Sequence, residues 1–314
     1  MILLLLQDIG GLEKKQSEMS LNRPVFKLKT CVSVDNLDWS YLSTNPCAFD
    51  FLMANADHID WPRFSSNPSD QVIDYLTLHP ERIDIGWLCL NSNPRCIKLI
   101  EERVHLLTDT DWQMLCSKPY AIELLKAHPE KINRYCANYL SRNPEIFVER
   151  DGRMVLENPF PAIRLDVNHL SSNPKAVEYL LENNFNMIFW WHFSSNPEAV
   201  EFLLQHPERI VWKGFSSNPS PKALEFMKKN KEEVDYVCLC KNSNPDSFEL
   251  LMEKPDLINW QILSSHPGIF TLDYDAMRAN NEQLEMELTT LIMHPKWVFK
   301  YPGFDFIEEM FGDD

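Results

Sequence analysis

Two sets of residues have the types and spacing that could bind a metal ion. Cys238 and Cys240 are the only close pair of cysteines in the chain. The other set is a histidine directly before the proline that should end a helix, at His79, His128, His206 and His294. A zinc site usually needs cysteines two residues apart and further ligands nearby, which Cys238 and Cys240 lack. We therefore favour core filling for the cysteines, and helix-end capping with a favourable dipole interaction for the histidines.

Other catalytic or cofactor-binding motifs are missing from the sequence. It contains no glycine-rich phosphate loop, no Gly-x-Ser-x-Gly elbow and no His-Glu-x-x-His helix, and it has only 8 glycines. We therefore expect neither enzymatic activity nor a cofactor.

The composition limits the partners that this chain of 314 residues could bind. Acidic residues outnumber basic ones by 46 to 30, and the formal net charge is -16. This balance disfavours nucleic acid and anionic membranes, which both recruit lysine and arginine. The apolar opening Met1 to Leu6 lacks the basic start and cleavage site of a signal peptide, and no apolar run is long enough to span a membrane. Scattered cysteines suit a reducing compartment, so we expect an intracellular protein without a membrane segment.

A proline recurs every 22 to 30 residues through most of the chain, and in eight of ten copies it follows an asparagine. The marker prolines are Pro46, Pro68, Pro94, Pro119, Pro144, Pro174, Pro197, Pro219, Pro245 and Pro267. The preceding asparagines are Asn45, Asn67, Asn93, Asn143, Asn173, Asn196, Asn218 and Asn244. Periods of this length are typical of solenoids, in which each unit packs on its neighbours.

Large apolar residues keep a fixed distance from the marker proline. Tryptophan stands seven residues before it in seven copies: Trp39, Trp61, Trp87, Trp112, Trp190, Trp212 and Trp260. We expect these tryptophans to be buried between stacked units. Replacing Trp212 by alanine should then cost about 3–5 kcal/mol of stability.

The copy around Pro197 shows why each unit should be helical. Proline favours the first helical position, and Asn196 before it is a good N-cap. An amphipathic helix should follow until His206-Pro207 stops it. A second, shorter element then carries Trp212, and Asp60, Asp111 and Asn259 are candidate caps for its equivalents elsewhere. The repeated asparagines could act as simple caps or could also bond to the backbone of the next unit, and the two alternatives are equally favoured.

The sequence thus predicts an all-α fold. We expect an α-solenoid of about ten repeats of 22–26 residues, each an α-helix plus a short α or 3₁₀ helix. Residues 1–36 should form an N-terminal lead-in or cap, and residues 37–270 the solenoid. Residues 271–314 should form a C-terminal helical cap with an acidic tail.

Few residues stand out as binding candidates. Residues 145–165 form the longest insertion, and a tolerated surface loop is favoured over a recognition loop there. The weak binding candidates are Asp151 and Arg153 in this insertion, and Trp191 and His192 beside a repeated tryptophan.

The Leu-Ser-x-Asn-Pro repeats, together with Ile269-Phe270 and His294-Pro295 in the C-terminal stretch, resemble a family of uncharacterised repeat proteins of large nucleocytoplasmic DNA viruses. The resemblance covers about residues 37 to 302, although Lys118 and His266 replace the asparagine in two copies. The architecture also resembles the leucine-rich-repeat-variant solenoids. The viral resemblance implies a location in the cytoplasm of an infected cell or in the virion, and neither family supplies catalytic residues.

We expect a non-enzymatic scaffold that binds another protein, with a basic partner segment suiting its charge. A structural component of a virion or assembly is the alternative. A cryptic enzyme or metal-binding protein is a third, less favoured one.

Overall fold

The structure is a computed structural model that describes residues 23–292. As the sequence predicts, these residues are mostly helical. They fall into two compact units: Leu28–Thr271, and a second unit made of the two chain ends, described for residues 23–27 and 272–292. Most of the predicted N-terminal lead-in, the predicted acidic tail and His294 lie outside the described residues.

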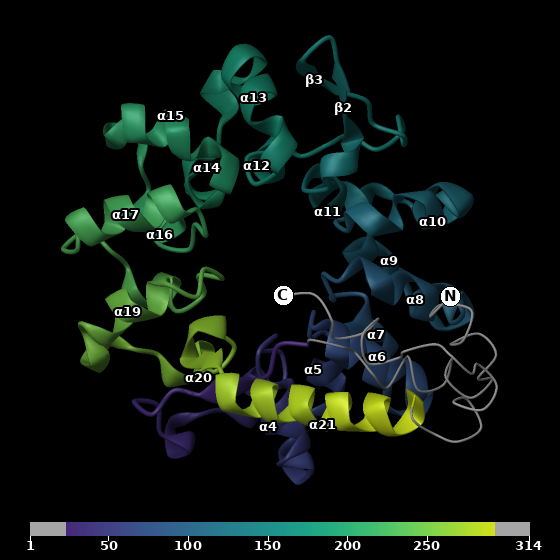
Figure 1. Ribbon diagram of the computed structural model, residues 1–314. Helices are drawn as coiled ribbons and strands as arrows, with labels where there is room; N and C mark the ends of the chain where they lie inside the picture. Colours follow the sequence, from purple (N-terminus) through teal and green to yellow (C-terminus); the bar gives the residue numbers. More distant parts are fainter. Residues whose placement is uncertain (1–22, 293–314) are drawn as a thin grey trace, which may run out of the picture. The chain divides into compact units, whose positions relative to one another are not determined.

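The unit Leu28–Thr271 consists mainly of short helices that alternate between two kinds (Figure 1). The first kind, here the A helices, are α3 (Trp39–Leu42), α5 (Trp61–Ser65), α7 (Ile85–Leu88), α9 (Asp109–Leu115), α11 (Ala137–Ser141), α12 (Val167–Leu170), α14 (Trp190–Ser195), α16 (Trp212–Phe215), α18 (Tyr236–Leu239) and α20 (Trp260–Leu263). The second kind, the B helices, are α4 (Phe49–Met53), α6 (Asp70–Leu78), α8 (Ile97–Glu101), α10 (Ile122–Ala127), α13 (Val177–Asn183), α15 (Val200–Gln205), α17 (Pro221–Lys229) and α19 (Ser247–Met252). In Figure 1, α12, α14 and α16 lie on the inner side of a ring, and α13, α15 and α17 on its outer side.

Short 3₁₀ helices connect these elements. They are Val34–Asn36, Ala56–His58, Pro80–Arg82, Pro94–Cys96, Val104–Leu106, Pro119–Ala121, Pro129–Lys131, Arg134–Cys136, Pro144–Ile146, Pro174–Ala176, Phe185–Met187, Pro197–Ala199, Pro207–Arg209, Pro255–Leu257 and Pro267–Ile269. In six of the ten units the marker proline therefore starts a 3₁₀ turn, and in four of these six a B helix begins directly after the turn. The B helix ends where predicted in the Pro197 unit, because His206 before Pro207 is the C-cap of α15.

The buried asparagines that follow the A helices do both things that the sequence left open. Asn218 accepts a hydrogen bond from the Ser220 N–H (3.0 Å), which caps the turn. Its Nδ2 also donates to the backbone oxygens of Ser194 and Asn196 in the preceding unit, both at 2.9 Å. The asparagines that bond to the preceding unit in this way are Asn45, Asn67, Asn91, Asn143, Asn173, Asn196, Asn218 and Asn242.

The serine two residues before this asparagine links each unit to the following one. Ser216 donates from Oγ to the Trp212 backbone oxygen (2.7 Å) and accepts from the Asp235 N–H (3.0 Å) of the next unit. The serines that accept such a bond from the next unit are Ser43, Ser65, Ser141, Ser171, Ser194, Ser216 and Ser264. The buried polar atoms of the repeat motif are thus used to join units.

The same bonds join the last unit to the first. The Asp38 N–H donates to Ser264 Oγ (2.9 Å), and Asn45 Nδ2 donates to the backbone oxygens of Ser264 (3.0 Å) and His266 (2.8 Å). The units of Leu28–Thr271 therefore follow one another around a closed ring, which the sequence analysis did not foresee.

The proline register is wrong by two residues in the units of Pro94 and Pro245. There the inter-unit bonds are made by Asn91 and Asn242, not by Asn93 and Asn244. Two extra residues separate the A helix from the proline in these units. Asn93 and Asn244 cap the turn and bond to the carbonyls of Pro68 and Pro219, and Asn93 also donates to Asp70 Oδ1 (2.7 Å). Trp87 is accordingly the third residue of α7, whereas the repeated tryptophans of α3, α5, α14, α16 and α20 begin their helix.

The repeated tryptophans are less buried than predicted. Trp112 is 1% exposed, but the other six are only partly buried. Trp212 stacks on Phe226 of the adjoining B helix, with ring centroids 6.0 Å apart, and is only partly buried. The core is formed instead by the leucine or phenylalanine in the last turn of each A helix, such as Phe215, which is 0% exposed.

The predicted helix caps are correct in two of three cases. Asp60 and Asn259 accept backbone hydrogen bonds at the starts of α5 and α20. Asp111 is instead the third residue of α9, where it forms a capping box with Thr108.

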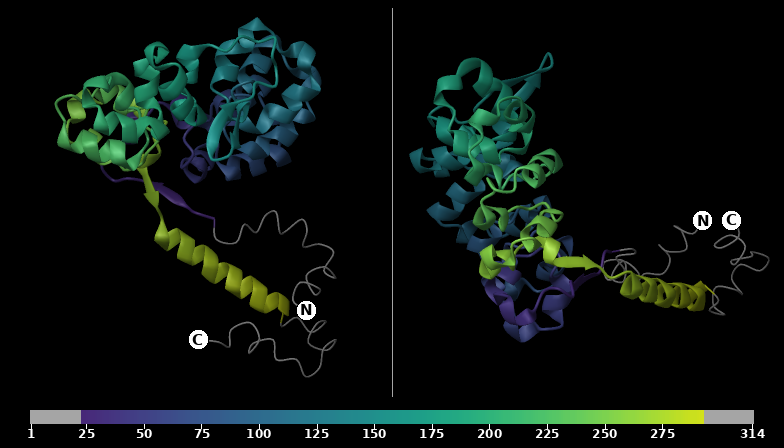
Figure 2. Two further views of the ribbon diagram at one scale, coloured as in Figure 1. Left: turned by 90° about the horizontal axis from the view of Figure 1, so that it is seen from above. Right: turned by 90° about the vertical axis from the view of Figure 1, so that its left-hand side faces the viewer.

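The described ends of the chain contain two paired strands and one long helix. Strand β1 (Phe26–Leu28) pairs with β4 (Phe270–Leu272), and α21 (Tyr274–Ile292) is a single uninterrupted helix (Figure 2). Asp273 accepts the Ala276 N–H at the start of α21 and pairs with Lys27 (3.0 Å). Within the described range, α21 and the shorter helices all lack the apolar length that a membrane crossing requires.

Candidate functional site

A β-hairpin replaces the B helix in the unit of Pro144. Strands β2 (Phe147–Arg150) and β3 (Arg153–Leu156) pair antiparallel, with Asp151 and Gly152 as the two turn residues. Both turn residues have positive φ, 51° and 76°, as a two-residue type I′ turn requires. This is a local departure from the all-α prediction. The insertion at 145–165 is not simply a loop, and its Asp-Gly between apolar residues was a hairpin signal.

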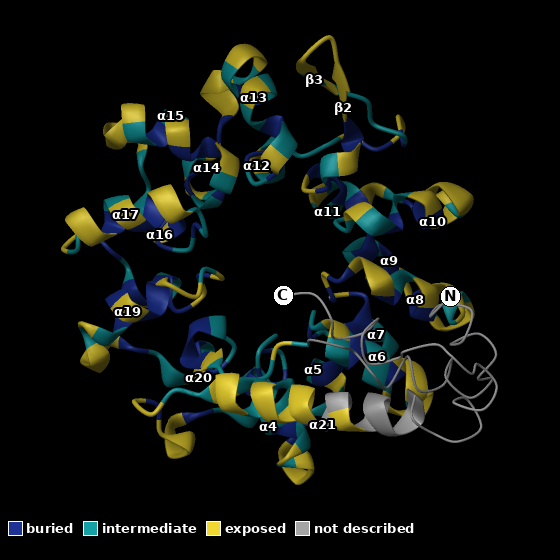
Figure 3. Cartoon of the chain, in the orientation of Figure 1, coloured by how far each residue is buried: buried dark blue, intermediate teal, exposed yellow. Residues whose placement is uncertain are grey.

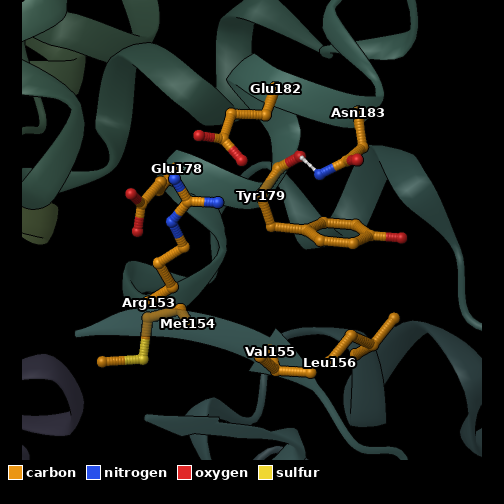
Figure 4. Close-up of a pocket in the computed structure, with 8 residues that line it drawn as sticks. All are labelled: Arg153, Met154, Val155, Leu156, Glu178, Tyr179, Glu182 and Asn183. Carbon is orange, nitrogen blue, oxygen red and sulfur yellow. Dashed lines mark hydrogen bonds between the residues drawn. The ribbon is translucent and has the colours of Figure 1, made fainter. Parts of the chain in front are cut away.

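A groove runs between the hairpin and α13 (Figure 4). Its volume here is about 390 Å³, and Arg153 extends from β3 towards the face of α13 that carries Glu178 and Glu182. On the same helix, Asn183 Nδ2 donates to the Tyr179 backbone oxygen (3.1 Å). The lining residues are Arg153, Met154, Val155, Leu156, Glu178, Tyr179, Glu182 and Asn183.

The groove continues across α13 to α15 with a further volume of about 770 Å³. Met154, Glu178 and Glu182 line both parts, so the two are adjacent. Leu181 and Phe202 add partly buried apolar surface in the second part. We call the two parts together the hairpin groove. Figure 3 shows that the hairpin of β2 and β3, whose β3 forms one of its walls, is largely exposed.

The charged residues of the hairpin groove are mostly carboxylates. Glu178, Glu182 and Glu198 are exposed, and none of them forms an ion pair with a described residue. Glu201 differs, because it pairs with Lys222. The groove thus combines an apolar floor with three carboxylates that form no ion pair in the described chain and one arginine, Arg153, that also forms none there.

No protein-family model, characterised protein or solved structure matches this chain. What it binds must therefore be inferred from its own residues. Of the four candidates taken from the sequence, only Arg153 lines the hairpin groove, and Asp151 lies in the adjacent turn.

Trp191 and His192 lie on α14 in a separate aromatic cluster. Trp191 is 44% exposed, and the His192 ring lies 5.0 Å from it and 4.9 Å from Phe189. His192 Nδ1 is 3.0 Å from the Asn168 backbone oxygen, and burial lowers the pKa of His192. Neither residue lines the hairpin groove.

The residues considered for metal binding do not form a cluster in the described part of the chain. Burial raises the pKa of both Cys238 and Cys240, which disfavours the thiolate form that binds a metal. The C-caps of three B helices are His79, His128 and His206. The structure brings no three His, Cys, Asp or Glu side chains together for a metal ion anywhere in the described chain.

Sequence reasoning missed Met154, Glu178, Glu182 and Phe202. The spacing of Glu178 and Glu182 was an available signal, since residues four apart share one face of a helix. Their approach to Met154 was not readable from the sequence, because it depends on how the hairpin packs against α13.

Proposed function

We propose that this chain is a non-enzymatic α-solenoid, closed into a ring, that acts as a scaffold for a protein partner. The observation that carries this proposal is the hairpin groove. It occurs in the unit that departs most from the repeat, and it joins exposed apolar side chains to free carboxylates. Concave, partly apolar surfaces with a few polar groups are the usual sites of recognition.

The repeated polar residues support this proposal, because their side chains already form hydrogen bonds inside the protein. The amide of Asn218 and the hydroxyl of Ser216 are buried and are occupied by bonds within and between units. Recognition then falls to residues that differ from unit to unit, as those of the hairpin do.

Affinity purification from cells that express the tagged full chain tests the proposal. One variant replaces residues 148–155 by a short Gly-Ser turn, and Trp191→Ala serves as a control outside the groove. Circular dichroism should show equal helical content in all three proteins. We expect the hairpin variant to lose partners that the intact chain and Trp191→Ala retain. Recovery of the same partners by all three proteins, or of none beyond a tag-only control by the intact chain, would contradict the proposal.

A further inference from the structure

The floor of the hairpin groove is apolar and open to solvent. Met154 from β3, Leu181 from α13 and Phe202 from α15 contribute to it, and each is only partly buried. These three side chains come from three separate elements. Covering them would remove apolar surface from water, which favours a partner that presents a large apolar side chain.

The rim carries carboxylates that form no ion pair with a described residue. Glu178 and Glu182 lie one turn apart on α13, where like charges destabilise a helix. Glu182 also lies in the last turn, close to the negative end of the helix dipole, whereas Glu178 lies in the first turn, where a carboxylate is favourable. The repulsion between the two side chains and the position of Glu182 are therefore the unfavourable contributions, and a cation placed between the two would relieve them.

The nearby described basic residues form no ion pair with these glutamates. Lys175 pairs with Glu145 (3.0 Å), and no ion pair joins Arg153 to Glu178 or Glu182 within the described chain. Figure 4 shows Arg153 extending from β3 towards Glu178, so its guanidinium offsets only part of the charge of the glutamates that line the groove.

We infer that the hairpin groove binds a protein segment in which a lysine or arginine stands next to a large apolar residue. This inference rests on the proposed function and names its partner's chemistry. The basic side chain lies between Glu178 and Glu182, and the apolar one covers Met154 and Phe202. The net charge of -16 steers such a segment towards the protein and repels anionic ligands.

Fluorescence anisotropy with labelled peptides tests the inference on the full-length protein. The probe is a short fluorescein-labelled peptide of alternating lysine and leucine. Two reference peptides carry glutamate in place of lysine, or serine in place of leucine. We expect saturable binding of the lysine-leucine peptide that weakens as salt rises, and about tenfold weaker or undetectable binding of both references.

Two double variants locate the binding surface. Glu178→Gln with Glu182→Gln removes two of the three unpaired carboxylates of the groove, while Glu101→Gln with Glu233→Gln makes the same change in net charge at exposed positions outside the groove. The first should weaken binding of the lysine-leucine peptide about tenfold. The second should leave it unchanged, and Met154→Ser should weaken it without altering its salt dependence.

Three results would overturn the inference: no binding of the lysine-leucine peptide, equal weakening by both double variants, or full binding by Glu178→Gln with Glu182→Gln. Any of them is distinguishable from failure of the scaffold proposal. Cellular partners could still depend on the hairpin while being insensitive to the two glutamates.

Discussion

Asn45 donates a hydrogen bond from Nδ2 to the backbone oxygen of His266 at 2.8 Å, across 221 residues of sequence. The same bond, also 2.8 Å, runs from Asn67 to Asn45 one unit further along the chain. The junction between the last and first units therefore repeats an ordinary junction. A ring of this kind leaves no end unit to be covered, so the packing face of the last unit needs no C-terminal cap.

The closed ring predicts that Asn45→Ala destabilises the protein. This change leaves the Ser264 and His266 carbonyls without their amide donor, as Asn218→Ala does for Ser194 and Asn196. Each variant should lower the free energy of unfolding by about 2–4 kcal/mol, because buried polar groups lose their partners. Urea denaturation followed by circular dichroism measures both. A large loss for Asn218→Ala with almost none for Asn45→Ala would indicate an open array.

The burial of the A helices predicts that Phe215 matters more than Trp212. Phe215 is completely buried, so Phe215→Ala should cost about 3–5 kcal/mol of unfolding free energy. Trp212 is partly exposed and mainly stacks on Phe226, so Trp212→Ala should cost only about 1–2 kcal/mol. Urea denaturation of the two variants shows which of them loses more unfolding free energy. Equal or reversed losses would restore the tryptophan core that the sequence predicts.

Because His266 is buried, the free energy of unfolding should fall at mildly acidic pH. The Nδ1 of His266 accepts the Gly268 N–H (2.9 Å), and burial lowers its pKa to about 4. The unfolded chain, with an ordinary histidine pKa near 6.5, binds the proton more readily. The stabilisation is therefore complete above about pH 6.5 and is lost as pH falls towards 4, by about 3 kcal/mol.

The variant His266→Asn isolates this effect. Asparagine occupies the same place in most units and can accept the Gly268 N–H without titrating. Unfolding free energies measured from pH 7 to pH 4 should fall less steeply in the variant than in the wild type. Parallel curves would show that His266 does not titrate with folding.

The local structure of each unit could be read from the sequence. Asn196 caps the turn at Pro197, and His206 ends α15, because capping and proline chemistry depend only on adjacent residues. The register at Asn91 was missed, since the proline marker moved while the asparagine kept its place after the A helix.

Features that depend on accumulated geometry could not be predicted. Closure between Asn45 and His266 depends on the rotation between successive units summed over the whole ring. The hairpin groove depends on where Met154 meets α13, and no spacing in the sequence encodes that distance. Of the candidate residues, Arg153 could be identified because it lies in the longest insertion of the repeat array, residues 145–165.

Distance measurement by double electron–electron resonance tests the closed ring most directly. Genetically encoded spin labels at Ser40 and Gln261 span the junction, because α3 and α20 belong to the first and last units. Labels at Lys213 and Val237, in the consecutive helices α16 and α18, give the reference distance and leave the native cysteines in place. A closed ring predicts short, narrow and matching distributions for the two pairs. A long or broad distribution for Ser40 and Gln261, with a short one for the reference pair, would contradict it.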